Sequence, residues 1–589
     1  MTAGQSTHLD LFSYLWIAAG AVSIFYASVF IVSALRTGFL VLVRGQGLVF
    51  FPVNIVVFGK QFDLTIFGVS VAVASGILVL RRIRRIVLSR SQLLLVVPSS
   101  VLLFAIVEVA AAARWVAGGF IPGLPFGDAS WKISFVEMQF VNTLYLVAPR
   151  IMLIFLLSWL FALLSRHYPE PIKRWLIALQ ARPPGTAVLR PGSPLDTVRK
   201  SNLLPNLLLT LGLALAIYIS AYPYLPAVNP GGKIVGVDTP YYLEKLESAR
   251  GSSAGPFPVA LSDDRILLHL LNYALSLSTG DPALTLKILP AVLSVLLVVS
   301  TFFFVRIATG RPYLGGLASL FTPLAFQQIV GINAGFYANW LALVEANLYF
   351  AFLLRALKRP SFRTLLGTNV MLVLVLFTHP WTWFVLMASL AVFMLVGLLT
   401  TSRAKGLFVI PLVVAVNISV DAIRTVSLPF LQSGAEVAYS SLLPGFSLTD
   451  LPVILGVLEE TFGTFLGGAL YNYGIILLSI LGFLSLRDYR DHLNRLLLSL
   501  AISGLIGIFL FSSDFVGYLH ARALYVIPFA LFAALGFDAL TRSLGQTSRN
   551  LGLSDSYVRF LTVSLGLFVT TVMFNHVVRM AATVYPYVG

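Results

Sequence analysis

Long apolar stretches recur along the whole chain, and they constrain its fold more than any other feature. A helix needs about 20 apolar residues to cross a hydrocarbon core about 30 Å thick. Transmembrane strands would instead appear as alternating segments of about ten residues. The expected fold is therefore all-α, a polytopic transmembrane helix bundle of about 15 spans, give or take two. We place the spans at 12–35, 62–80, 93–116, 141–165, 203–221, 283–306, 313–330, 338–357, 364–378, 382–400, 407–422, 471–486, 495–511, 523–541 and 558–580.

Composition excludes several other classes of protein. Hydrophobic residues make up 58% of the chain and charged residues 11%, whereas soluble domains average about 45–50% and 25%. The net charge of +16 is diluted through this apolar chain, so we expect it at a membrane surface and expect no nucleic-acid partner. The absence of Cys excludes disulfides, thiolate zinc sites and a cysteine nucleophile. The first ten residues carry no Lys or Arg, so we expect a retained first span rather than a cleaved signal peptide.

Basic residues mark alternate loops, which predicts the orientation of the spans. They concentrate in 81–90, 166–200, 355–363, 403–405, 487–495 and 542–559. Short cytoplasmic loops carry an excess of Lys and Arg. We therefore expect a multi-pass protein of the cell (plasma) membrane with a cytoplasmic N-terminus and an extracytoplasmic C-terminus. The same loops could also bind anionic lipids or a partner.

A basic, proline-rich segment divides the chain. Residues 166–202 contain Arg-Pro-Pro-Gly and Arg-Pro-Gly-Ser-Pro, which disfavour regular structure. We expect a cytoplasmic linker there, between a four-span membrane domain of unknown role (1–165) and a domain of roughly 11 spans (203–589). Loops on the outer side of the second domain are long, and its first outer loop should carry surface helices. No inverted repeat of the kind common in transporters relates the two parts.

The first outer loop contains the first candidate site residue, Asp238. Thr239 and Pro240 can start a helix, so Asp238 could simply cap it. Alternatively, Asp238 acts as a base or orients an acceptor at the membrane surface. Glu244 follows on the same predicted helix.

A second acidic group follows in the same loop. Asp263, Asp264 and Arg265 precede an amphipathic, Leu-rich stretch that carries His269 and Asn272. The two aspartates could cap this helix, or they could join Asp238 in binding a divalent cation, Mg or Mn, through oxygen ligands. Arg265 is a candidate for binding a phosphate.

Three further outer turns are rich in polar and aromatic residues. Aromatic residues favour membrane interfaces, so a belt role is the simpler interpretation for most of them. The cationic residues are less easily explained, because topogenic charge belongs on the inner side. They could bind an anionic phosphate, although Arg522 could instead pair with Asp514. The candidates in these turns are Tyr337, Asn339, Trp340, His379, Trp381, His520 and Arg522.

Charged residues inside spans are expensive, at about 2.5–3.5 kcal/mol each on insertion scales. Glu108, Arg114, Glu137 and Arg150 in the first domain would suit a proton path or internal pairing. Glu345 lies one to two helical turns below Asn339 and could line a cavity that opens outward.

These features together resemble the GT-C superfamily of integral-membrane glycosyltransferases, of the protein-mannosyltransferase or family-39-like type, over about residues 203–589. The resemblance is carried, in chain order, by Val237–Tyr242, Asp263–Arg265 with the helix that follows, Gly335–Trp340, Thr378–Trp381 and Arg522–Phe529. Thr239 stands where protein mannosyltransferases have the Glu of an Asp-Glu pair, and a Trp-Trp-Asp motif is absent.

The resemblance implies transfer of a sugar from a polyprenyl-phosphate donor to a glycan, lipid or protein acceptor on the extracytoplasmic face. Asp238 would be the catalytic residue, and Asp263, Asp264 and Glu244 would serve the acceptor, a cation or the surface helices. Apolar walls between the spans would hold the isoprenoid tail, and membrane lipids would be further partners. Arg522, His520, His379 and Arg265 would bind the donor phosphate, and Tyr337, Asn339, Trp340, Glu345 and Trp381 would line the cavity.

Two other classes of function remain open at this point. A transporter or lipid flippase would use charged groups near mid-bilayer, such as Glu108, Arg114 and Glu345. A non-catalytic scaffold of envelope glycan assembly would use the four-span part to dock a partner.

Overall fold

The computed structural model describes residues 16–25, 27–28, 69–77, 94–121, 203–400, 408–428, 472–486, 489, 491–506 and 523–583. These residues form helices and turns and contain no strand. Eight helical segments among them are long and apolar enough to cross a membrane. The described part of the chain is thus all-helical and has the character of a membrane protein. The expected span at 141–165 lies outside the described residues.

The chain divides into two compact units. One comprises Met1–Leu164 and Thr541–His576, and the other comprises Ser165–Leu540 and Val577–Gly589.

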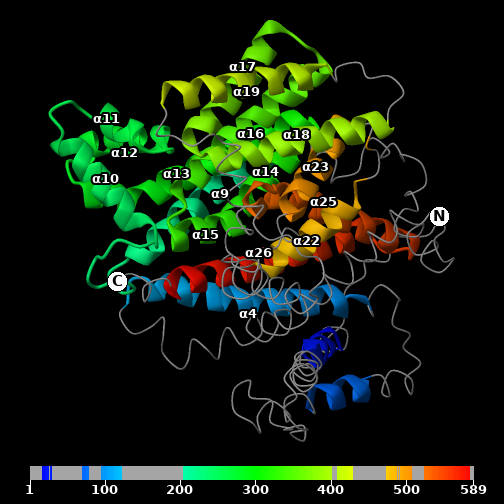
Figure 1. Cartoon of the computed structure of the whole chain (residues 1–589). Coiled ribbons are helices and arrows are strands. Elements are labelled where there is room, and N and C mark those ends of the chain that lie inside the picture. The colour runs from blue at the N-terminus through cyan, green and yellow to red at the C-terminus, as the bar shows by residue number, and fades with distance from the viewer. Residues whose placement is uncertain are drawn as a thin grey trace, which may run out of the picture. The chain divides into compact units, whose positions relative to one another are not determined.

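In the first unit, α4 packs beside α26, as Figure 1 also shows. The helices are α4 (Val96–Gly118) and α26 (Asp555–Thr583), the last part of which belongs to the second unit. Phe104 and Phe568 lie with ring centroids 5.7 Å apart. Asn575 Nδ2 donates to the backbone oxygen of Glu108 at 3.0 Å and to its carboxylate at 2.6 Å. Glu108 is therefore internally paired, one of the two readings that its sequence position allows.

The second unit is built around α13, which packs against α9, α14 and α16. Several of its helices carry a proline in their first turn. The N–H that proline lacks would have no partner within the helix at that position, so its absence costs nothing. The α-helices in chain order are α9 (Leu203–Ala221), α10 (Thr239–Gly251), α11 (Phe257–Leu261), α12 (Ile266–Thr279), α13 (Pro282–Thr309), α14 (Pro312–Phe321), α15 (Phe326–Ala334), α16 (Tyr337–Lys358), α17 (Phe362–Thr378), α18 (Pro380–Thr400), α19 (Val409–Ser427), α22 (Tyr473–Leu484), α23 (His492–Ile506) and α25 (Phe529–Asn550), of which residues 541–550 belong to the first unit. Short 3-10 turns are η1 (Tyr222–Tyr224), η2 (Thr322–Leu324) and η4 (Ala523–Val526).

The span predicted at 313–330 is a broken one. It runs as α14, η2 and α15, because Pro323 interrupts the helical hydrogen bonds, and Ala325 is extended. The whole hydropathic window of this segment is buried inside the unit. Asn472 Nδ2 donates to the free Leu324 carbonyl at 3.0 Å. The break is tolerated because protein, not lipid, surrounds it.

The span predicted at 523–541 is wrong in its bounds. Residues 523–526 form η4, and α25 begins only at Phe529, after Pro528. Asp538 of α25 pairs with Arg311 at 3.1 Å, which gives this helix a charged partner. Among the described residues, α25 is not one of the eight segments apolar enough to cross a membrane.

Glycines allow the closest helix contacts in the second unit. A Cβ at Gly212 of α9 would overlap Ser319 of α14, and a Cβ at Gly536 of α25 would overlap Leu478 of α22. Membrane helices use small residues in this way because close van der Waals packing replaces the hydrophobic driving force.

We predict that Gly536→Ala destabilises the protein, because the new methyl group would overlap the Leu478 carbonyl and force α22 and α25 apart. Overpacking of this kind costs about 1–3 kcal/mol. Thermal unfolding of the purified protein in detergent measures the effect. Gly251→Ala in α10 is the matched control, because its Cβ would meet nothing within 4 Å. Equal unfolding midpoints for the two variants would contradict the prediction.

Candidate functional site

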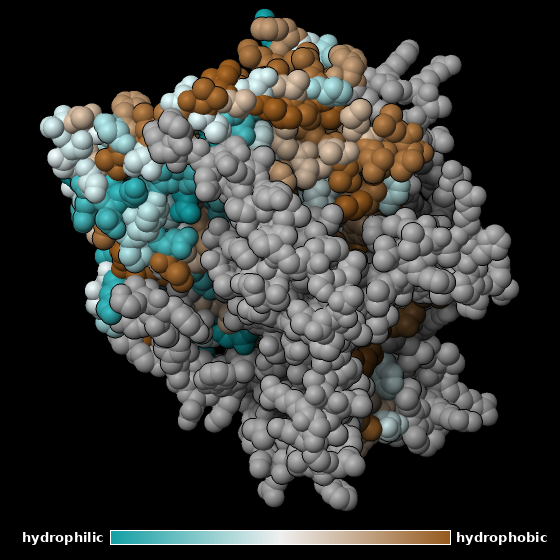
Figure 2. Space-filling view, in the orientation of Figure 1, coloured by the Kyte–Doolittle hydropathy of each residue, from teal (hydrophilic) through white to brown (hydrophobic). Residues whose placement is uncertain are grey.

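The segment between α9 and α13 forms a group of helices with many polar side chains at one end of the second unit. It contains α10, α11 and α12. Figure 2 shows hydrophilic side chains gathered over these helices, whereas the surface over α17 and α19 is mostly hydrophobic. The helices expected in the segment after the span 203–221 are therefore present as α10, α11 and α12, and they carry the acidic candidates.

Two glycines fix the backbone at Asp238. Gly236 has φ +111° and Gly335 has φ +70°, both in the left-handed region that favours glycine. A Cβ on Gly335 would lie 2.9 Å from Thr239 Oγ1 and 3.2 Å from the Asp238 nitrogen. The Asp238 N–H donates to the Ala334 carbonyl at 2.9 Å. The α15–α16 turn therefore holds Asp238 in place.

Asp238 is the residue before α10, as predicted, but its side chain makes no capping hydrogen bond. The capping interpretation is therefore wrong. The half-buried carboxylate of Asp238 instead raises the pKa values of two neighbours, Tyr242 and Arg265. Burial raises the pKa of the Tyr242 phenol, and the charge of Asp238 adds to that rise. Burial alone would lower the pKa of Arg265. The charges of Tyr242 and of the nearby carboxylates, Asp238 included, outweigh burial and raise that pKa.

Arg265 lies at the centre of this group. Its Nη1 donates to Tyr242 Oη at 2.8 Å, and its Nε is 3.7 Å from Asp264 Oδ1. The guanidinium carbon lies 5.5 Å from the Tyr241 ring centroid and 5.6 Å from that of Tyr242. Such cation–π contacts orient a guanidinium without consuming its donors. Arg265, a candidate phosphate ligand, is thus preorganised beside Asp238.

The two adjacent aspartates have different partners. Asp263 Oδ2 contacts His269 Nε2 at 2.8 Å, and its Oδ1 accepts from the Arg265 N–H at 3.2 Å. Asp264 faces Arg265 and is influenced by the charge of Arg424 from α19. Neither aspartate is the residue that caps α12. That residue is Arg265, which makes no side-chain capping bond, so the prediction that the aspartates cap α12 is wrong.

The environments of these two carboxyls move their pKa values apart. Burial and hydrogen bonding to Asp263 raise the pKa of Asp264 to about 6. Burial alone would raise the pKa of Asp263, but His269, Asp264 and Arg265 together hold it well below its usual range. Divergent values of this kind often mark functional carboxyl pairs.

A hydrogen-bond chain links this group to α16. Thr239 Oγ1 donates to the Val235 carbonyl at 2.7 Å and lies 3.0 Å from Tyr337 Oη. The rings of Tyr337 and Tyr242 lie 5.5 Å apart. Tyr337 of α16 therefore supports Thr239 and Tyr242.

Glu345 lies deeper, against the α17–α18 turn. Its Oε1 accepts from Thr378 Oγ1 at 2.8 Å, while its Oε2 has no hydrogen-bond partner among the described residues. His379 follows Thr378, and its Nδ1 accepts from the Thr382 N–H at 3.2 Å, so in the neutral ring the proton lies on Nε2.

Other buried polar atoms of this region also have no partner in the described part of the chain. They include Asn339 Nδ2, Trp340 Nε1, Trp381 Nε1 and both amide atoms of Asn272. Buried polar groups are normally hydrogen-bonded, so atoms of this kind mark places for water or a ligand. Three other predicted site residues are not part of this group of buried polar side chains. Glu244 is exposed on α10, and His520 and Arg522 lie outside the described residues.

Tyr242 and the pair Asp421–Arg424 are members of the site that sequence reasoning missed. Arg424 Nη2 donates to Asp421 Oδ1 at 2.9 Å, and both side chains are buried. Asp421, inside the expected span 407–422, with Arg424 just beyond its end, is a usable signal, because such charges are rare in spans unless paired or functional.

No three side chains in the described ranges, among His, Cys, Asp and Glu, are placed to hold a metal ion together. Asp263 is engaged by His269 and the Arg265 backbone, and Asp264 faces Arg265. The acidic group is therefore arranged around a guanidinium.

We predict that Asp264→Asn changes the pH dependence of stability. The folded pKa of Asp264, about 6, lies above its ordinary value of 3.8, so the folded state binds the extra proton between these values. Wild-type stability should therefore fall as pH rises from about 4 to about 6, and this decrease should be smaller in the variant. Chemical unfolding in detergent across that range measures the slope. An identical slope for both proteins would contradict the prediction.

No protein-family model matches the sequence, and no curated protein matches it. Its function is therefore inferred from its own side chains.

Proposed function

We propose that this chain is an integral-membrane glycosyltransferase that moves a sugar from a polyprenyl-phosphate-linked donor to an acceptor on the extracytoplasmic face. The observation that carries the proposal is the fixed position of Asp238 beside Arg265 and Tyr242. A carboxylate beside a guanidinium at a membrane surface suits an acceptor hydroxyl and a lipid phosphate. The resemblance to GT-C glycosyltransferases over residues 203–589 agrees with this function.

The proposed reaction is a displacement at the anomeric carbon. The acceptor oxygen attacks that carbon, the bond from the carbon to the phosphate oxygen breaks, and the acceptor proton passes to the Asp238 carboxylate. General-base catalysis of this kind contributes about 10²–10⁴-fold to the rate. The polyprenyl phosphate leaves with both bonding electrons.

Arg265 would stabilise the charge that develops on the leaving phosphate. Its Nη1 is already oriented by Tyr242, so little reorganisation would be needed. We propose that His379 assists through Nε2. Arg522 and His520, the other predicted phosphate ligands, lie outside the described residues. Because the described acidic side chains surround Arg265, we assign no step to a divalent cation.

The buried polar atoms without partners suit the sugar itself. Asn339 Nδ2 and Trp381 Nε1 are donors, and Glu345 Oε2 can accept. A sugar ring offers hydroxyls to such atoms and C–H faces to indole rings. Each buried polar atom left bare costs about 1–3 kcal/mol, so a ligand that pairs them gains affinity.

A flippase or transporter is the second candidate, and one observation favours it. The α19 face that carries Asn417, Asp421 and Arg424 is buried, and Asn417 also bonds Asn369 of α17 at 3.1 Å. A polar stripe inside a span can guide a headgroup through the bilayer.

We predict that Asp238→Asn lowers sugar transfer by about 10²-fold or more, because the base is removed while the shape is kept. Membranes containing the protein are given radiolabelled polyprenyl-phosphate sugars, and transfer to endogenous acceptors is measured. Asp281→Asn is the matched control, because Asp281 caps α13 through the Ala283 N–H at 2.9 Å and Asn caps equally well.

The outcomes separate the candidates. Unchanged transfer by a well-folded Asp238→Asn protein would remove Asp238 from the reaction. Headgroup translocation in liposomes without any transfer would favour the flippase. If neither sugar transfer nor headgroup translocation is observed, the non-catalytic scaffold is the remaining explanation.

A further inference from the structure

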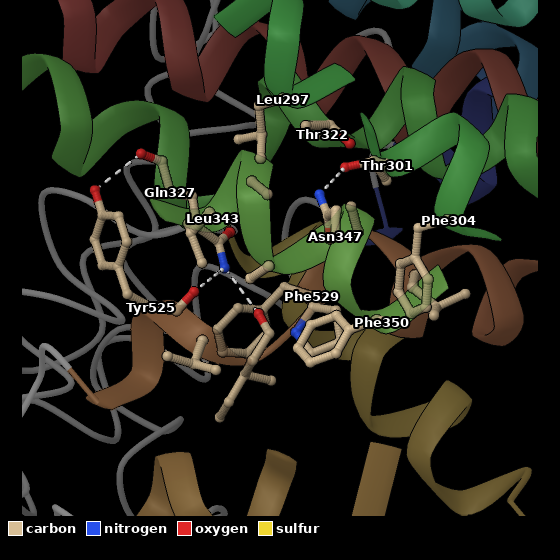
Figure 3. Close-up of a pocket in the computed structure, with 17 residues that line it drawn as sticks. Leu297, Thr301, Phe304, Thr322, Gln327, Leu343, Asn347, Phe350, Tyr525 and Phe529 are labelled. Carbon is tan, nitrogen blue, oxygen red and sulfur yellow. Dashed lines mark hydrogen bonds between the residues drawn. The ribbon is translucent and has the colours of Figure 1, made fainter. Parts of the chain in front are cut away.

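A small pocket lies among α13, α15, α16 and the segment 525–531, away from the Asp238 group (Figure 3). Its volume is about 40 Å³, and most of its lining is apolar. A cavity can hold a water molecule once it offers about 10–15 Å³, so this pocket has room for about one or two water molecules but none for a sugar ring or a lipid chain. Two of its polar lining residues, Thr301 and Asn347, lie well inside the candidate spans Pro282–Thr309 and Tyr337–Lys358.

Gln327 is one of two amides that line the pocket. Its Nε2 donates to the backbone carbonyls of Tyr525 at 3.1 Å and Ile527 at 2.8 Å. Carbonyl oxygens only accept, so this atom is the nitrogen and both of its N–H groups are used. Gln327 Oε1 accepts no hydrogen bond from the described residues.

Asn347 is the other amide. Its Nδ2 donates to Ser300 Oγ and Thr301 Oγ1, each at 3.1 Å. Ser300 already donates its only hydroxyl proton to the Leu297 carbonyl at 3.0 Å, so it must accept from Asn347. This fixes the amide orientation and leaves Asn347 Oδ1 without a donor in the described part of the chain.

Thr301 has the opposite deficit. Its Oγ1 accepts from Asn347 Nδ2, but its hydroxyl proton reaches no acceptor within the described ranges. The other hydroxyl on the lining, that of Thr322, donates to the Ala318 carbonyl at 2.7 Å. The pocket therefore presents two oxygens that lack a donor and one O–H group that lacks an acceptor.

Water is the ligand that matches this set of groups. It offers two O–H donors to the two amide oxygens and a lone pair to the Thr301 hydroxyl, and buried water molecules typically make about three hydrogen bonds. A metal cation would contact the oxygens, but its charge would be buried among apolar walls whose lining includes no Asp or Glu. An empty pocket would leave all three groups unpaired.

The backbone around the pocket is also where water is expected. Thr322 and Ala325, which belong to the break between α14 and α15, line the pocket. Irregular backbone at membrane depth is tolerated where protein surrounds it or where it lines a hydrated cavity. A hydrated pocket at this break meets the second of these conditions.

We propose that this pocket is a water site inside the second unit, in which bound water donates to Asn347 Oδ1 and Gln327 Oε1 and accepts from Thr301 Oγ1. The water joins α13 and α16 to α15, and through Gln327 to the carbonyls of Tyr525 and Ile527. The site is independent of the proposed sugar transfer, because no member of the Asp238 group lines it.

Radiolytic footprinting of the full-length protein in lipid nanodiscs tests the proposal. X-ray pulses split water into hydroxyl radicals, which oxidise side chains beside the water from which they form, and mass spectrometry locates the added oxygen. A water-soluble scavenger removes the radicals formed in bulk solvent. We expect Phe350, a buried residue of the lining, to be oxidised with the scavenger present. Phe321, which is similarly buried but does not line the pocket, is the matched control and should remain unmodified.

Two variants locate the water. Asn347→Leu replaces an amide oxygen by a methyl group, so the oxidation of Phe350 should be lost. Asn369→Leu changes a span amide that bonds Asn417 and does not line the pocket, so the oxidation should be kept. Wild-type protein in which Phe350 is oxidised no more than Phe321 would overturn the proposal even if a variant failed to fold. Unchanged oxidation in a folded Asn347→Leu protein would overturn it as well.

Discussion

The constraint on which the structure most depends is the exclusion of water from the interior of the second unit. Every polar group on a span must then find a partner in protein or remain bare at a cost of about 1–3 kcal/mol. The broken span α14–η2–α15 shows how this is met. Gln328 Nε2 bonds Ser220 at 2.8 Å, Ser294 bonds Gln328 Oε1 at 2.6 Å, and Asn472 closes the carbonyl freed at Leu324. Asn472 thus replaces one helical bond lost at the break, and Gln328 ties α15 to hydroxyl groups of α9 and α13.

The Asp238 group depends on that broken span. The α15–α16 turn ends the span, and its backbone carbonyls accept from Val237 at 3.2 Å and Asp238 at 2.9 Å. Gly236 and Gly335 permit this approach, because a side chain on either would meet Thr239. The position of Asp238 is thus set by the buried core rather than by its own loop. A loop tied to a rigid element keeps its carboxylate within reach of Arg265 and Tyr242 without a capping bond.

The sequence predicts the regular parts of this fold and much less of the site. The span at 203–221 coincides with α9, and the spans at 283–306 and 338–357 match α13 and α16 to within three residues, because long apolar runs can only be satisfied as helices. The start of α10 after Asp238 follows from Thr239-Pro240. The roles of Asp263 and Asp264 did not follow, since a capping rule considers only the helix start, whereas His269 contacts Asp263 and the Arg265 side chain faces Asp264. Arg424 approaches Asp264 from α19, and no spacing in the sequence relates the two. The span count of about 15 remains a prediction beyond the eight candidate spans in the described residues.

Buried polar groups in the second unit fall into two kinds, and the difference bears on function. Asn417 is fully used, since it donates to Asn369 and the Val413 carbonyl and accepts from Trp383 Nε1 at 3.4 Å. Such residues join helices, and their replacement by apolar residues of the same shape can be nearly neutral. Asn339, Glu345 and Trp381 each keep an atom bare. Folding alone gives no reason to retain these atoms, because an apolar side chain would remove the cost. Their concentration near the α15–α16 and α17–α18 turns, in the same part of the fold as Asp238, is what a ligand rich in hydroxyl groups would explain.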